Sequence, residues 1–157
     1  LAPLEMVPVP LQELVQTVRA EVMAKYPLRA VEWQIADDLP TVLADATLLH
    51  QALTHVMGNA LKFTAPRALA KIDIRTVPGA LEGYVALQVR DNGVGYNLAQ
   101  QDRLFRVFGR LHSAKQFEGI GMGLVLTRKI LARMGGSVSA QGGLDAGCCV
   151  KLQLQRA

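Results

Sequence analysis

The stretch KIDIRTVPGALEGYVALQVRDNGVG, residues 71–95, is the part of the sequence that most constrains the fold. Charged residues at 71, 73 and 75 alternate with Ile72, Ile74 and Thr76, and apolar residues recur at every second position over 85–89. This period of two is typical of strands with one buried face, and Pro78-Gly79 between the two segments indicates a turn. Because the segments are close in sequence, we expect them to pair as antiparallel strands.

Outside this stretch, the sequence predicts three helices and three further strands. Apolar residues at helical spacing predict helices over about 10–26, 45–63 and 122–134, with Asp45 as an N-cap and Gly135-Gly136 as a stop signal. Strands are predicted at 31–35, around Val138 and over 148–154, whereas the opening up to Pro10 is predicted to be an extended lead-in. Several antiparallel strands with three amphipathic helices on one face predict an α+β, two-layer sandwich.

Composition indicates a single globular domain over residues 1–157. Half of the residues are hydrophobic and 19% are charged, which excludes intrinsic disorder. We find no secretory signal and no apolar run long enough for a membrane helix, and the free cysteines Cys148 and Cys149 suit a reducing compartment. These features predict a soluble, cytoplasmic module, and Leu1 in place of Met indicates a piece of a longer protein.

The net charge of +4 is concentrated in one segment. Residues 101–134 hold seven basic and two acidic side chains, a local charge of +5. A positive field beside glycines favours a phosphate site, although a solvated helix face would look similar. Nucleic-acid binding is not favoured, because aromatic residues are only 5% and no recognition motif is present.

The second predicted helix carries a row of polar residues. Gln51, His55, Asn59 and Lys62 follow each other at steps of four, four and three, so they share one face of that helix. An ordinary amphipathic helix also has such a face, yet an amide beside a lysine suits a hydrated Mg²⁺ ion and a phosphate.

Asp91-Asn92-Gly93-Val94-Gly95 follows the predicted strand over 85–89. The period of two places Asp91 on the apolar face, where a carboxylate needs a partner such as the exocyclic amine of adenine. Gly93 and Gly95 allow a tight turn and a close backbone approach to a ligand, although Asn-Gly is also a simple turn signal.

The region between that turn and the third helix is predicted to be a long lid over about 96–120. Arg110 in this lid could reach a terminal phosphate. Gly119, Gly121 and Gly123 open the third helix, where free backbone N–H groups favour an anion; a flexible hinge is the alternative.

Together these segments resemble the N, G1, F and G2 boxes of sensor histidine kinases. The resemblance rests on HVMGNALKFT from His55, DNGVGYN from Asp91, LFRVFGRLH from Leu104 and EGIGMGLVLTRKI from Glu118. The segment FGRLHSAKQFEG is most similar to phytochrome-type light-sensor kinases. The resemblance implies a mixed, mostly antiparallel five-stranded sheet backed by three helices, with ATP bound between the sheet, the helices and the lid.

The resemblance also implies a role for each site residue. Asp91 would accept a hydrogen bond from the adenine amine, Asn59 would ligate Mg²⁺ and Lys62 would contact phosphate. Gly93 and Gly95 would shape the pocket floor and the start of the lid. Arg110 would stabilise the γ-phosphate, and the phosphate chain would be wrapped by Gly119, Gly121 and Gly123.

One position departs from the family pattern. His55 stands where the N box usually begins with Asn, at or near the metal and the phosphates. A neutral histidine could ligate the metal or donate a hydrogen bond, whereas a protonated one would repel it. A tolerated substitution is the favoured interpretation, and altered turnover of Mg·ATP is the alternative.

The implied function is transfer of the γ-phosphate of ATP to a histidine on an adjoining dimerisation domain. A response regulator would receive the phosphoryl group in turn, and the whole protein is expected to be a homodimer although this chain alone is expected to be a monomer. None of the three histidines is followed by the acidic residue of the phosphoacceptor motif, so that domain is expected to lie outside this chain. The alternative is a nucleotide-binding regulatory module with weak kinase activity, serving phosphatase control or scaffolding.

Overall fold

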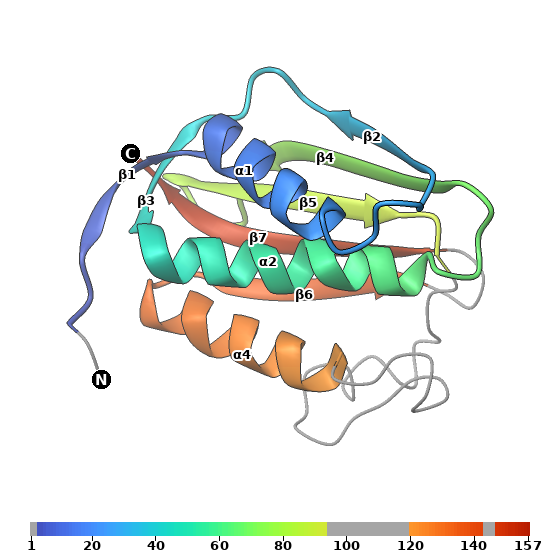
Figure 1. Ribbon diagram of the computed structural model, residues 1–157. Coiled ribbons are helices and arrows are strands. Elements are labelled where there is room, and N and C mark those ends of the chain that lie inside the picture. Colours follow the sequence, from blue (N-terminus) through green and yellow to red (C-terminus); the bar gives the residue numbers. More distant parts are fainter. Residues whose placement is uncertain (1–2, 94–119, 143–146) are drawn as a thin grey trace.

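Three helices lie on one face of a seven-stranded sheet in the part of the chain that the structure describes (Figure 1). The structure is a computed structural model, and it describes residues 3–93, 120–142 and 147–157. The helices are α1 (Leu11–Met23), α2 (Ala46–Phe63) and α4 (Ile120–Arg133). The strands are β1 (Met6–Pro10), β2 (Val31–Ile35), β3 (Thr41–Asp45), β4 (Ala70–Pro78), β5 (Tyr84–Asp91), β6 (Ser137–Gly142) and β7 (Cys148–Arg156).

The strands follow the order β1-β3-β7-β5-β4-β2, and β6 also pairs with β7. All pairs are antiparallel except β2 with β4, so the predicted mixed, mostly antiparallel sheet is confirmed. The pairing predicted within residues 71–89 is confirmed as well, with Ile74 opposite Val89. Strand β7 is central, because β5 lies along one edge and β6 and β3 along the other.

The predicted strand count of five was too low. The two additional strands are β1, which corresponds to the predicted lead-in, and β3, which lies just before the α2 cap. Strand β1 contains Pro8 and Pro10, which lower strand propensity, but it pairs only with β3. At such an edge position a missing N–H donor disrupts no second ladder, so the prolines are tolerated.

The ends of α2 and α4 form as the sequence predicts. The carboxylate of Asp45 accepts a hydrogen bond from the Leu48 amide at 3.0 Å, which is the N-cap interaction. After α4, the Gly136 amide donates to the Leu131 carbonyl at 2.8 Å and the Gly135 amide to the Ala132 carbonyl at 3.1 Å. These two bonds, with Gly135 at φ +77°, make a Schellman motif, whose left-handed residue is usually glycine.

The hydrophobic core lies between the helices and the sheet. Fully buried side chains come from every layer, including Leu11 on α1, Leu53 on α2, Leu87 on β5, Leu131 on α4 and Leu152 on β7. Among the described residues, no helix is both long enough and apolar enough to cross a lipid bilayer. The α+β sandwich therefore positions the C-terminal half of α2, the end of β5 and the beginning of α4 around one region (Figure 1).

Candidate functional site

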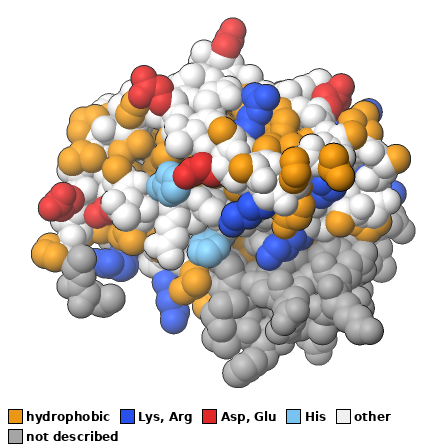
Figure 2. Space-filling view, in the orientation of Figure 1, with side chains coloured by type: hydrophobic (Ala, Val, Ile, Leu, Met, Phe, Trp, Pro, Cys, Tyr) orange, Lys and Arg blue, Asp and Glu red, His pale blue; other side chains and the backbone are white. Residues whose placement is uncertain are grey.

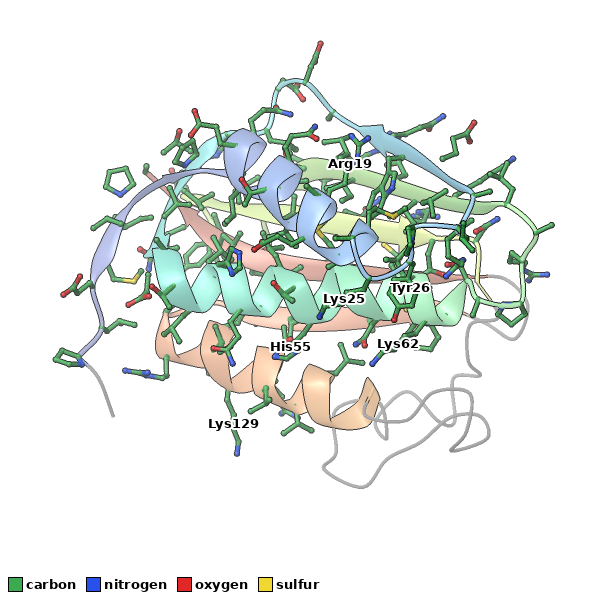
Figure 3. The ribbon with its side chains drawn as sticks, viewed as in Figure 1. Arg19, Lys25, Tyr26, His55, Lys62 and Lys129 are labelled. Carbon is green, nitrogen blue, oxygen red and sulfur yellow. The ribbon has the colours of Figure 1, made fainter. Side chains whose placement is uncertain are left out.

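The polar face of α2 is partly buried. Leu49, Leu53 and Leu61 point into the core, and Gln51 on the opposite side is exposed. Between these sides, His55 and Lys62 are half-buried and Asn59 is only 5% exposed. The burial arises because α4 packs against α2, and Figure 3 shows His55 and Lys62 on the side of α2 that faces α4.

Two side-chain atoms on this face are buried without a partner. Among the described residues, neither His55 Nε2 nor Asn59 Nδ2 has a hydrogen-bond partner. Buried polar groups are nearly always paired, so two unpaired atoms one helical turn apart make this face a candidate ligand site. Burial, with a smaller contribution from the positive charge of Lys62, lowers the pKa of His55. The ring is therefore mainly neutral at pH 7.

Asp91 ends β5 with its side chain directed toward the interior, as the period of two predicts. The residue is 6% exposed, and its Oδ1 accepts hydrogen bonds from the Gly93 amide at 2.8 Å and the Cys148 amide at 3.3 Å. Desolvation by burial raises the pKa of Asp91 to about 7, although both hydrogen bonds favour the charged form. Burial wins because two N–H donors replace only part of the hydration of a carboxylate.

Glycines bring three chain segments close to Asp91. A Cβ atom on Gly93 would lie 2.4 Å from the carbonyl oxygen of Phe63, the last residue of α2. A Cβ atom on Gly147 would lie 2.2 Å from the carbonyl oxygen of Asp91 itself, and Gly147 has φ +80°. The turn after β5 therefore lies directly on the C-terminal end of α2, the helix that carries Asn59 and Lys62.

The side chains of Arg67 and Asn92 hold this turn. Arg67 donates from Nε to the Asn92 carbonyl at 2.8 Å and from a terminal nitrogen to the Gly93 carbonyl at 3.1 Å. The Asn92 side chain accepts from the Lys71 amide at 2.8 Å and donates to the Leu69 carbonyl at 3.1 Å. The Asn-Gly pair was a visible turn signal, but no sequence pattern indicated the contribution of Arg67, which lies 25 positions before Asn92.

The glycine-rich segment is described only in part. Gly121 and Gly123 lie in the first turns of α4, which agrees with the prediction that these glycines open the third helix. Gly95, Arg110 and Gly119 lie outside the described residues, as does nearly all of the predicted lid over 96–120.

Positive side chains surround the exposed side of this region. Figure 2 shows lysine and arginine side chains grouped around a histidine on the face formed by the helices.

On the helix-free face, a hollow of about 270 Å³ is lined by Glu32, Lys71, Asp73 and Arg90 among others. Asp91 also lines part of this hollow, but Arg90 and Asp91 point to opposite faces of β5, so the Asp91 carboxylate is directed toward the helices. The described residues contain no cluster of three or more His, Cys, Asp or Glu side chains suited to a metal ion.

Comparison with known proteins gives the class of this chain. It belongs to the family of histidine kinase-, DNA gyrase B- and HSP90-like ATPases, whose sequence profile matches residues 44–157. Within that family it is homologous to the ATP-binding domains of histidine kinases. Cyanobacterial phytochrome A of Nostoc is 36% identical over 111 residues, which cover 71% of this chain and 14% of that protein. The BarA histidine kinase of Escherichia coli is also 36% identical, with 67% of this chain and 12% of that protein covered.

Solved structures support the same class. The mycobacterial sensor histidine kinase MprB superposes with a TM-score of 0.79 at 21% identity, covering 96% of this chain and 98% of that one, which shows a shared fold. Full-length ShkA in complex with AMPPNP superposes with a TM-score of 0.75 at 30% identity, covering 99% of this chain and 32% of that one. The resemblance identified from the four sequence boxes is therefore confirmed, including the similarity to phytochromes.

Proposed function

We propose that this chain binds ATP together with a divalent cation and transfers the γ-phosphate to a histidine on an adjoining dimerisation domain. The chain spans about one-seventh or less of the length of the first curated relatives, so this activity belongs to a larger protein. Two relatives are named as histidine kinases, and ShkA was solved with an ATP analogue. A response regulator is the proposed final acceptor, and a homodimer is the proposed assembly of the whole protein.

The observation that carries this proposal is the environment of Asp91. One carboxylate oxygen accepts two backbone N–H bonds, which fix the orientation of the group in a buried position. A carboxylate that has lost most of its hydration is a strong acceptor for a donor brought by a ligand. We propose that the exocyclic amine of adenine is this donor. Guanine presents a carbonyl oxygen at the equivalent position, so it would be rejected.

The residues of α2 fit a cation and the phosphate groups. The two unpaired atoms on His55 and Asn59 require polar partners, and Lys62 supplies a positive charge on the same face. The Asn59 amide can present its oxygen by a half-turn of its terminal bond, and amide oxygens are ligands that Mg²⁺ accepts. A bound Mg²⁺ ion would supply charge neutralisation at the phosphates.

The remaining roles are proposed for the glycine-rich segments and the lid. Backbone N–H groups of Gly119, Gly121 and Gly123 would bind the phosphate chain at the beginning of α4. Gly93 and Gly95 would allow the nucleotide to approach the turn, and Arg110 would bind the γ-phosphate. Phosphoryl transfer depends mainly on positioning and charge stabilisation, which is the work that these residues are suited to do.

Nucleotide titration calorimetry tests the proposal. We expect the wild-type chain to bind AMPPNP in the presence of a divalent cation and to bind the guanine analogue GMPPNP at least about 100-fold more weakly, because a buried acceptor would face an acceptor. The Asp91→Asn variant should lose most of its affinity for AMPPNP, whereas the exposed Asp37→Asn control should keep it. Equal affinities for the two nucleotides would contradict the proposal.

A second function is favoured by His55. This residue replaces the usual first Asn of the N box, so phosphotransfer could be weak and nucleotide binding could serve a regulatory role. Phosphorylation of a supplied phosphoacceptor domain by His55→Asn and wild-type proteins separates the two functions. A large gain of activity in the variant would favour the regulatory module, and unchanged activity would favour the kinase.

A further inference from the structure

The unpaired nitrogens on α2 are a distinctive feature of this chain. Three buried side-chain atoms have no hydrogen-bond partner among the described residues: Trp33 Nε1, His55 Nε2 and Asn59 Nδ2. The Trp33 nitrogen lies on β2 and can only donate a proton. The other two lie on one face of one helix at positions i and i+4, where Cβ atoms are about 5–6 Å apart. Of the three residues, only His55 and Asn59 are placed to bind the same partner.

The chemistry of these two side chains limits that partner. No hydrogen bond is formed by His55 among the described residues, so no carboxylate or carbonyl holds its ring in place. The other histidine of α2 differs, because His50 Nε2 lies 2.6 Å from Glu21 Oε1. An imidazole nitrogen and an amide oxygen on adjacent turns form a mixed N,O donor pair. Mg²⁺ prefers oxygen ligands alone, whereas imidazole nitrogen suits later first-row ions.

We propose that His55 Nε2 is a ligand of the cation that accompanies the nucleotide, so that this site binds a first-row transition-metal ion in preference to Mg²⁺. This inference rests on the proposed nucleotide-binding function and specifies the cation of that same site. The His55→Asn exchange removes the nitrogen ligand and supplies an amide, which is suited to Mg²⁺. The affinity for the nucleotide with its cation should therefore rise from Mg²⁺ to Mn²⁺ to Co²⁺, and this rise should be larger in the wild-type chain than in the variant.

The first experiment measures AMPPNP affinity at pH 8 with each of the three cations. For the wild-type chain we expect Co²⁺ to give at least about tenfold tighter binding than Mg²⁺, and for His55→Asn we expect this ratio to fall close to one. The matched control is His50→Asn, which removes a histidine from the same helix but outside the site. It should keep the wild-type ratio.

The second experiment observes the ligand directly. Mn²⁺ bound to the wild-type chain with AMPPCP, whose phosphate bridge contains no nitrogen, should show ¹⁴N modulation in its pulsed electron paramagnetic resonance spectrum, and His55→Asn should lose it while His50→Asn retains it. This measurement on the wild-type chain does not depend on how well a variant folds. Nucleotide binding without nitrogen modulation would overturn the inference and leave the proposed function intact. Absence of nucleotide binding with every cation would overturn both.

Discussion

At the scale of single residues, Asp91 combines deep burial with two hydrogen bonds that favour its charge. Its raised pKa shows that the hydrogen bonds do not fully compensate for lost hydration, so the apo protein is less stable with the charged form present. Functional sites often retain such destabilising groups, because the ligand supplies the missing interaction. Asp91 is therefore better suited to binding a ligand than to stabilising the folded chain.

The titration of Asp91 leads to a prediction about the free energy of unfolding. The folded state holds this proton up to about pH 7, whereas the unfolded chain releases it near pH 4. The stabilising contribution of the group is therefore complete at low pH and is lost as the pH rises through about 7. Asp91→Asn keeps an oxygen that can accept from Gly93 and Cys148 but does not titrate.

We expect the stability of the Asp91→Asn variant, relative to wild type, to increase from pH 5 to pH 7 and to become constant above about pH 8. The total change should be on the order of a few kcal/mol, since one pKa unit corresponds to about 1.4 kcal/mol. Urea unfolding without nucleotide at each pH measures this difference. Parallel curves for the two proteins would show that burial does not perturb Asp91.

At the scale of elements, signals within one segment were sufficient for the three helices and for β2, β4, β5, β6 and β7. Asp45 precedes a helical apolar pattern, and its cap appears in the structure; Gly135-Gly136 ends α4 as expected. Strand β3 was missed because it runs directly into the cap residue Asp45, so that its residues were assigned to the loop and the helix start, and β1 because of its prolines. The two strands pair with each other, and β3 also pairs with β7. Such long-range pairing leaves little trace in a local pattern.

A glycine inside one helix and a glycine just after another should respond oppositely to alanine. Gly58 lies inside α2 and an added Cβ would have no atom within 4 Å, so Gly58→Ala should raise the free energy of unfolding by about 0.5–1 kcal/mol. Gly135 has φ +77° after α4, so Gly135→Ala should lower it by about 1–2 kcal/mol. Chemical denaturation of both variants checks the signs. Stabilisation by Gly135→Ala would mean that the Schellman motif is not needed to end α4.

The capping interaction of Asp45 has a second function that the sequence did not indicate. Its Oδ2 accepts from the Glu5 amide at 3.0 Å, so one side chain joins the N-terminus of α2 to the segment before β1. These backbone hydrogen bonds, led by that from Glu5, lower the pKa of Asp45.

Asp45→Asn should therefore lower the melting temperature at pH 7, and the difference from wild type should shrink as the pH falls into the acidic range where the wild-type carboxyl is protonated. Thermal unfolding at a series of pH values measures this. An unchanged difference down to pH 3 would exclude an electrostatic role for Asp45.

At the scale of the whole molecule, the candidate site is assembled from distant parts of the chain. Asp91 was identified from its strand period and Asn59 from its helical spacing, but their relation depends on the contact of Gly93 with the end of α2. The Cys148 amide and Arg67 complete the turn from other elements. The burial and placement of Asp91 and Asn59 therefore agree with local patterns, whereas the groups that hold them could not be predicted from such patterns.

The position of β7 predicts how strongly the sheet depends on one strand. Leu152 on β7 is fully buried, and Leu152→Ala should destabilise the protein by about 2–5 kcal/mol. Val7 on the edge strand β1 is 41% exposed, so Val7→Ala should change stability by less than about 0.5 kcal/mol. Unfolding monitored by circular dichroism and by the fluorescence of Trp33 on β2 should give coincident transitions for Leu152→Ala. Separate transitions would show that the sheet unfolds in parts.

Synthesis on the ribosome proceeds from β1 toward β7. Among the described strands, β7 alone joins the β1–β3 pair to the β4–β5 pair within the sheet. Until residues 148–156 leave the exit tunnel, no described strand pairs with both the β1–β3 pair and the β4–β5 pair. Each growing chain therefore carries two exposed half-sheets, and the hydrogen bond from the Cys148 amide to Asp91 can form only after β7 has emerged.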